Sequence, residues 1–93
     1  MTLDEEIRRG HEAERLMNEP MVKGAFGAIE SGLLDAMRRV PIGDHKTQHE
    51  LVLSLQILDK VKGYMREAME TGKLAKVQKE TMADKAKRLF RAA

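Results

Sequence analysis

The chain contains no cysteine and no tryptophan among its 93 residues. The missing cysteine excludes disulfides, cysteine-ligated zinc and thiol catalysis. Phe26, Tyr64 and Phe90 are its only aromatic residues, so a core has to be filled by aliphatic side chains and the seven methionines. No stretch approaches the roughly 18 consecutive apolar residues of a membrane helix, and we therefore expect no membrane partner.

Strand alternation, internal repeats and low-complexity tracts are also missing. Hydrophobic residues make up 42% of the chain and charged residues 34%, a balance that favours amphipathic helices. The length is sufficient for one small domain, residues 1–93. A core in so short a chain is marginal, and self-association is a common remedy.

Helix start and stop signals predict an all-α fold. Thr2 followed by Glu5 is typical of a helix N-terminus, and Pro20 suits the first turn of the next helix. Asp44 can cap a third helix, or Thr47 with Glu50 can do so as a capping box. Gly72 is expected to end that helix in a left-handed conformation. The prediction is a short helix at 3–17, a core antiparallel hairpin of 20–40 and 45–71, and a C-terminal helix at 74–91.

Two stripes run along the helix predicted at 20–40. Apolar residues recur at spacings of three and four from Val22 to Val40, as on a helix that packs lengthwise against another. Beside them, small residues recur at every fourth position; glycine is costly inside a helix, so this stripe indicates close packing unless a marginal helix merely tolerates it. The third helix has more apolar residues than one neighbour needs, so residues 3–17 or another copy would cover the excess. We predict a homo-oligomer whose interface contains Gly24, Ala28, Gly32, Ala36, Leu53, Ile57 and Tyr64.

The charge is unevenly distributed although the net charge is only +2. Residues 1–19 have a net charge of −3 and residues 73–93 a net charge of +5. The basic end could be a solvated helix, bind an acidic protein surface or follow nucleic-acid phosphates. Its candidate binding residues are Lys73, Lys76, Lys79, Lys85, Lys87, Arg88 and Arg91.

Catalytic constellations are not found in the sequence. His45 and His49 are four residues apart but lack the further ligands that a metal site needs, so two solvated histidines are the simpler interpretation. No carboxylate lies in an apolar run that would raise its pKa, and neither serine has a histidine within helical reach. We expect no enzyme, no metal and no cofactor.

Several short segments resemble a group of small helical proteins that tailed bacteriophages and prophages encode among their head and DNA-packaging genes. The matching segments are residues 14–20 (ERLMNEP), Ala25-Phe26, Val40-Pro41 with Asp44, residues 58–61 (LDKV) and residues 70–75 (ETGKLA). The resemblance covers most of residues 5–76 and transfers no catalytic residue. It implies a role in virion assembly, in packaging or in the particle. The basic helical end, which lies outside it, is similar in charge to the coat-binding end of phage scaffolding proteins.

Residue pattern and resemblance together lead to one hypothesis with two alternatives. The leading hypothesis is a non-enzymatic phage assembly or virion protein that binds copies of itself and other phage structural proteins, in the host cytoplasm during assembly or in the virion. The first alternative is a nucleic-acid-binding packaging or regulatory accessory that uses the basic end, with DNA as a candidate partner. The second is a small inhibitor of a host protein.

Overall fold

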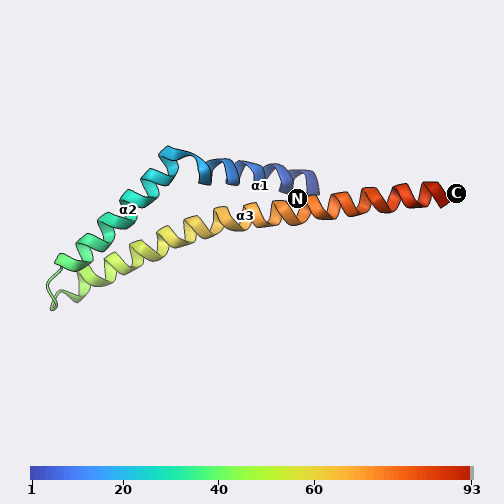
Figure 1. Ribbon diagram of the computed structural model, residues 1–93. Coiled ribbons are helices and arrows are strands. Elements are labelled where there is room, and N and C mark those ends of the chain that lie inside the picture. The colour runs from blue at the N-terminus through green and yellow to red at the C-terminus, as the bar shows by residue number, and fades with distance from the viewer. Residues whose placement is uncertain (93) are drawn as a thin grey trace. The chain divides into compact units, whose positions relative to one another are not determined.

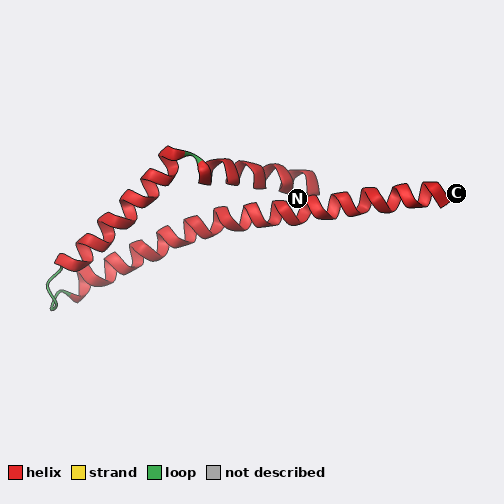
Figure 2. Cartoon of the chain, in the orientation of Figure 1, coloured by secondary structure: helices red, strands yellow, loops and turns green. Residues whose placement is uncertain are grey.

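The computed structural model of the protein describes residues 1–92, which form three helices with short connections (Figure 2). The helices are α1 (Leu3–Asn18), α2 (Pro20–Arg39) and α3 (His45–Ala92). No strand occurs in these residues, so the prediction of an all-α protein is confirmed. The chain divides into two compact units, which we call the terminal unit (residues 1–15 and 65–92) and the central unit (residues 16–64).

Side-chain caps fix the starts of α1 and α2 close to the predicted positions. The Thr2 hydroxyl oxygen accepts a hydrogen bond from the Glu5 N–H at 3.2 Å, which satisfies one of the free donors of the first turn. At α2, the carboxylate of Glu19 accepts from the Val22 N–H at 3.0 Å, and Pro20 occupies the first turn. Proline costs nothing there because its missing N–H would have no partner within the helix.

Asp44 caps the start of α3. Of the two predicted caps, Asp44 and Thr47 with Glu50, the structure thus uses Asp44. Its carboxylate accepts from both the backbone N–H of Thr47 (3.1 Å) and the Thr47 hydroxyl (2.7 Å). The side-chain amide of Gln48 donates to the carbonyl oxygens of Pro41 and Ile42, at 3.1 and 3.2 Å. These bonds tie the turn between α2 and α3 to the first turn of α3.

The helices predicted at 45–71 and 74–91 are one continuous helix of 48 residues. The prediction that Gly72 ends a helix in a left-handed conformation is therefore wrong. No glycine in residues 1–92 has a positive φ. Gly72 is instead a buried residue inside α3. It is buried because α1 of the terminal unit packs against it.

In the central unit, α2 and the first part of α3 contribute the apolar contacts. Leu58 is buried (7% exposed), and Val22, Phe26 and Leu33 of α2 are partly buried. The ammonium of Lys62 lies 2.9 Å from the Glu30 carboxylate, so an ion pair joins the two helices. Ile29, one of the apolar residues that recur along α2 at spacings of three and four, is 50% exposed.

In the terminal unit, α1 lies beside the second half of α3 (Figure 1). The buried residues are small: Gly10 and Ala13 on α1, and Ala68, Gly72 and Ala75 on α3. Side chains of this size allow two helix backbones to come much closer than leucine or isoleucine would allow. The sequence left residues 3–17 or another copy of the chain as a further partner of α3. In the terminal unit it is α1 that packs against α3.

Candidate interaction surfaces

Gly10 and Gly72 mark the closest approach of α1 and α3. A Cβ atom added to Gly72 would lie 2.8 Å from the Gly10 Cα and 3.0 Å from the Glu6 carbonyl oxygen. A Cβ on Gly10 would lie 2.8 Å from the Gly72 Cα and 3.0 Å from the Ala68 carbonyl oxygen. The obstructing atoms are all backbone, so neither helix can yield by turning a side chain. The crossing therefore requires glycine at both positions.

A second contact shows the direction of α1 relative to α3. The Lys79 ammonium donates to the Asp4 carboxylate at 2.6 Å. Asp4 precedes Gly10, whereas Lys79 follows Gly72, so the two helices are antiparallel. Both side chains of the ion pair are more than half exposed (59% and 74%), and such a pair adds little stability in water.

The predicted stripe of small residues on α2 has a different environment. Gly24, Ala28 and Gly32 are exposed and Ala36 is partly buried. A Cβ added to Gly24 or Gly32 would meet no other atom within 4 Å. Within the described chain no other helix comes close to Gly24 or Gly32, and the contact of the stripe with a second copy stays a prediction.

The other predicted interface residues are also on the surface of the central unit. Leu53 is 42% exposed, Ile57 61% and Tyr64 62%. The first two recur four residues apart on α3, as on one face of a helix. Together with Ile29 of α2 they leave large apolar side chains in contact with water.

The predicted basic residues all lie on α3 and are exposed. Lys79 is the one engaged by Asp4. Lys73 and Lys76 line a small hollow of about 160 Å³ beside the glycine crossing, opposite His11 and Glu14 of α1. The remaining basic residues come after Lys79 in the sequence, beyond its ion pair with α1: Lys85, Lys87, Arg88 and Arg91.

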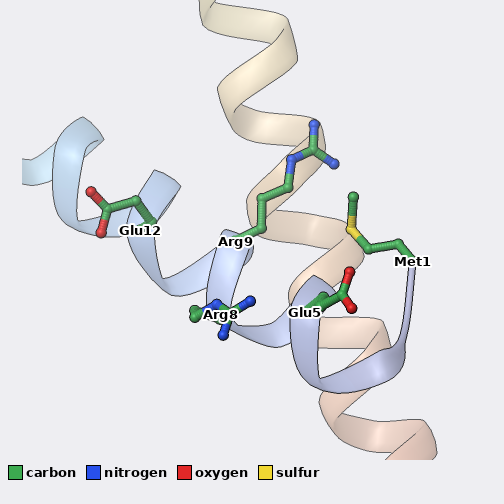
Figure 3. A pocket seen from close by; sticks show the side chains of 5 residues that line it. All are labelled: Met1, Glu5, Arg8, Arg9 and Glu12. Carbon is green, nitrogen blue, oxygen red and sulfur yellow. The ribbon is translucent and has the colours of Figure 1, made fainter.

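The surface of α1 has a shallow hollow lined by Met1, Glu5, Arg8, Arg9 and Glu12 (Figure 3). The charged groups do not converge on one point: Arg8 and Arg9 point in different directions, and Glu12 points away from both. Glu12 is paired with Arg15, and this guanidinium holds the pKa of the Glu12 carboxyl below its usual range.

None of the titratable side chains in residues 1–92 is fully buried. In residues 1–92 no three histidine, aspartate or glutamate side chains gather in a way that could hold a metal ion. His45 and His49 lie exposed in the first turns of α3. The hydrogen bonds from Thr47 lower the pKa of Asp44, as expected for a carboxylate that caps a helix.

Comparison with known proteins gives no match. No family model, no curated protein and no solved structure is significantly similar to the chain. Over the residues that the structure describes, none of the helices is both long enough and apolar enough to pass through a membrane.

Sequence reasoning missed the glycine crossing, although a signal for it exists. Gly10 and Ala13 are three residues apart, and Ala68, Gly72 and Ala75 are four and three apart, so each set forms one face of a helix. A helical glycine of this kind is recognisable only when its partner helix is known. Without that partner, Gly72 has the pattern of a helix end.

Proposed function

We propose that the protein is a non-enzymatic, self-associating structural protein that works through helix-mediated contacts, as a phage assembly or virion protein would. In this proposal α2 and the first part of α3 pair antiparallel, and copies of the chain meet through the faces that this pairing leaves bare. Gly24, Ala28 and Gly32 would receive a neighbouring helix backbone. Leu53, Ile57 and Tyr64 would supply the apolar contact area.

One observation carries the proposal: the chain buries very little on its own. Leu58 is the one buried residue larger than alanine in residues 1–92. Large apolar side chains nearby stay more than 40% exposed, among them Ile57 at 61%. Burying a fully exposed side chain of this kind yields about 1.5–3 kcal/mol, and covering the exposed part of these side chains yields a share of that. A second copy therefore offers the central unit stabilisation that a single chain lacks.

The decisive experiment measures the solution mass of the full chain by size exclusion with light scattering, for the wild type and for Gly32→Leu. The added side chain meets no atom of its own chain, and leucine favours the helix over glycine. We therefore expect the single chain to fold as well as before or better, while the oligomer dissociates. A lower mass with unchanged or higher helix content is the result that supports the proposal.

Gly27→Leu is the matched control. Gly27 lies on the same helix with no atom within 4 Å of an added Cβ, but about 140° around the helix from Gly32. This variant should keep the mass of the wild type. A monomeric wild type at both low and high salt would contradict the proposal and favour the inhibitor of a host protein.

A second candidate function is nucleic-acid binding, favoured by the exposed basic residues after Lys79. If Lys85, Lys87, Arg88 and Arg91 bind phosphates, affinity for duplex DNA should fall steeply with added salt. Changing all of them to alanine should then abolish binding. Binding that is weak at low salt, or that the substitution leaves unchanged, would remove this candidate.

A further inference from the structure

The face of α3 that α1 covers continues past the contact with α1. Ala68 and Ala75 are buried against α1, and Met82 and Leu89 follow at the same seven-residue interval. Gly72 and Lys79 also contact α1, and Ala86 follows seven residues later. Seven residues are close to two turns, so the later residues share the face of the earlier ones with a drift of about 20° per interval.

This continuation, which we call the bare stripe (Met82, Ala86, Leu89 and Phe90), has no cover in the described chain. Met82 is 62% exposed, Leu89 68% and Phe90 84%. Asp4 already pairs with Lys79, and α1 runs from there towards Gly72, away from the stripe. The interface between α1 and α3 thus ends while the apolar face of α3 goes on.

Charge on both sides of the stripe indicates what could cover it. Lys79 and Lys85 each lie three residues from Met82, so they flank it at about 60° on either side. The acidic residues between Lys79 and Phe90 are Glu80 and Asp84. Each lies two residues from Met82, which places it about 160° away on the far side of the helix. Asp4 of α1 already engages Lys79, so within the described chain Lys85 is the border lysine with no ion pair to α1, and the far side holds Lys87 and Arg91 as well as the two acids. An apolar strip with this basic surround is complementary to an amphipathic helix with acidic edges.

α1 is an example of the same recognition within the chain. Its first turn contains Asp4, Glu5 and Glu6, and Asp4 reaches the lysine that borders the stripe. We propose that the bare stripe binds an acidic amphipathic helix of a partner protein, placed antiparallel on α3 in continuation of α1. This inference rests on the proposed role in protein assembly and assigns the partner of the basic end.

The test titrates the full chain with a defined probe, a labelled peptide of about 18 residues with leucine at helical spacing and glutamate on both edges. We expect it to bind and to slow hydrogen exchange of the amides of residues 80–92. Met82→Ser combined with Leu89→Ser should weaken binding about tenfold or more, because two buried apolar contacts are lost. A peptide with lysine in place of glutamate should not bind.

Val77→Ser is the control variant. Val77 is 59% exposed on α3 and lies two residues from Ala75, on the opposite side of the helix, so this change should leave peptide binding intact. Equal loss in both variants would overturn the inference. Protection of the stripe by duplex DNA or by anionic phospholipid vesicles, without binding of the glutamate peptide, would also overturn it.

Solution mass separates this inference from the proposed self-association. Met82→Ser with Leu89→Ser should leave the mass of the protein unchanged, since the proposed contacts between copies lie in the central unit. A lower mass for this variant would mean that a second copy covers the stripe, which contradicts an acidic partner. A wild-type monomer that binds the peptide would refute self-association alone.

Discussion

Gly10 and Gly72 of the terminal unit and Gly24, Gly27 and Gly32 of the central unit are all helical glycines, yet their surroundings differ. An added Cβ would come within 2.8 Å of a backbone atom at the first two and would meet nothing within 4 Å at the other three. In both sets alanines lie three or four positions away on the same helix: Ala13 near Gly10, Ala68 and Ala75 near Gly72, and Ala28 between Gly24 and Gly32. What separates them is whether a second helix of the same chain crosses at that point, and this is a property of the tertiary structure.

The largest expected effect comes from a substitution that disrupts the glycine crossing of α1 and α3. Gly72→Leu forces a side chain against the backbone of α1, and overpacking of this kind typically costs about 1–3 kcal/mol. We expect α1 to leave α3, which hydrogen exchange would detect as loss of protection at residues 3–13. If those amides stay protected, the crossing is not what holds α1.

The next largest effect is an increase in stability rather than a decrease. Gly27→Ala places a methyl group in open space and removes the conformational cost of a helical glycine, so it should stabilise the central unit by up to about 1 kcal/mol. Thermal unfolding followed by circular dichroism measures this gain. Gly10→Ala is the counterpart, because the same methyl group should destabilise the protein there.

The caps of α3 and α1 should also differ in their response to acid. The lowered pKa of Asp44 means that its cap contributes stability above the ordinary aspartate pKa of about 3.9, and that this contribution is lost as the pH falls through the lowered folded value. Asp44→Asn keeps a capping side chain but cannot titrate, so it should remove this part of the pH dependence. The Thr2 cap of the terminal unit has no such response. Acid titration followed by amide signals of residues 45–48 distinguishes the variants.

The smallest effect concerns the ion pair at the end of α1. Lys79→Ala should cost at most about 1 kcal/mol, since both partners are exposed and salt screens them. The loss should shrink further at high salt in a denaturant titration. A much larger loss would mean that Lys79, rather than the glycine crossing, fixes α1.

Local signals predicted the helix starts well because the chemistry of a cap is local. Thr2, Pro20 and Asp44 each act on residues within one turn, so the sequence is sufficient to place them. Gly72 could not be placed in this way, because a glycine at a helix end and a glycine at a helix crossing have the same local pattern. The candidate interface of the central unit follows from periodicity, but periodicity does not name the molecule that covers it.

The crossing also has a genetic consequence. Every amino acid other than glycine has a Cβ, so no codon change at position 10 or 72 that replaces glycine preserves the contact of the two backbones. In a library of all single variants, selected for a docked α1, these two positions should be empty of substitutions. At Gly27 and Gly63, where an added Cβ meets no atom within 4 Å, most amino acids should be tolerated.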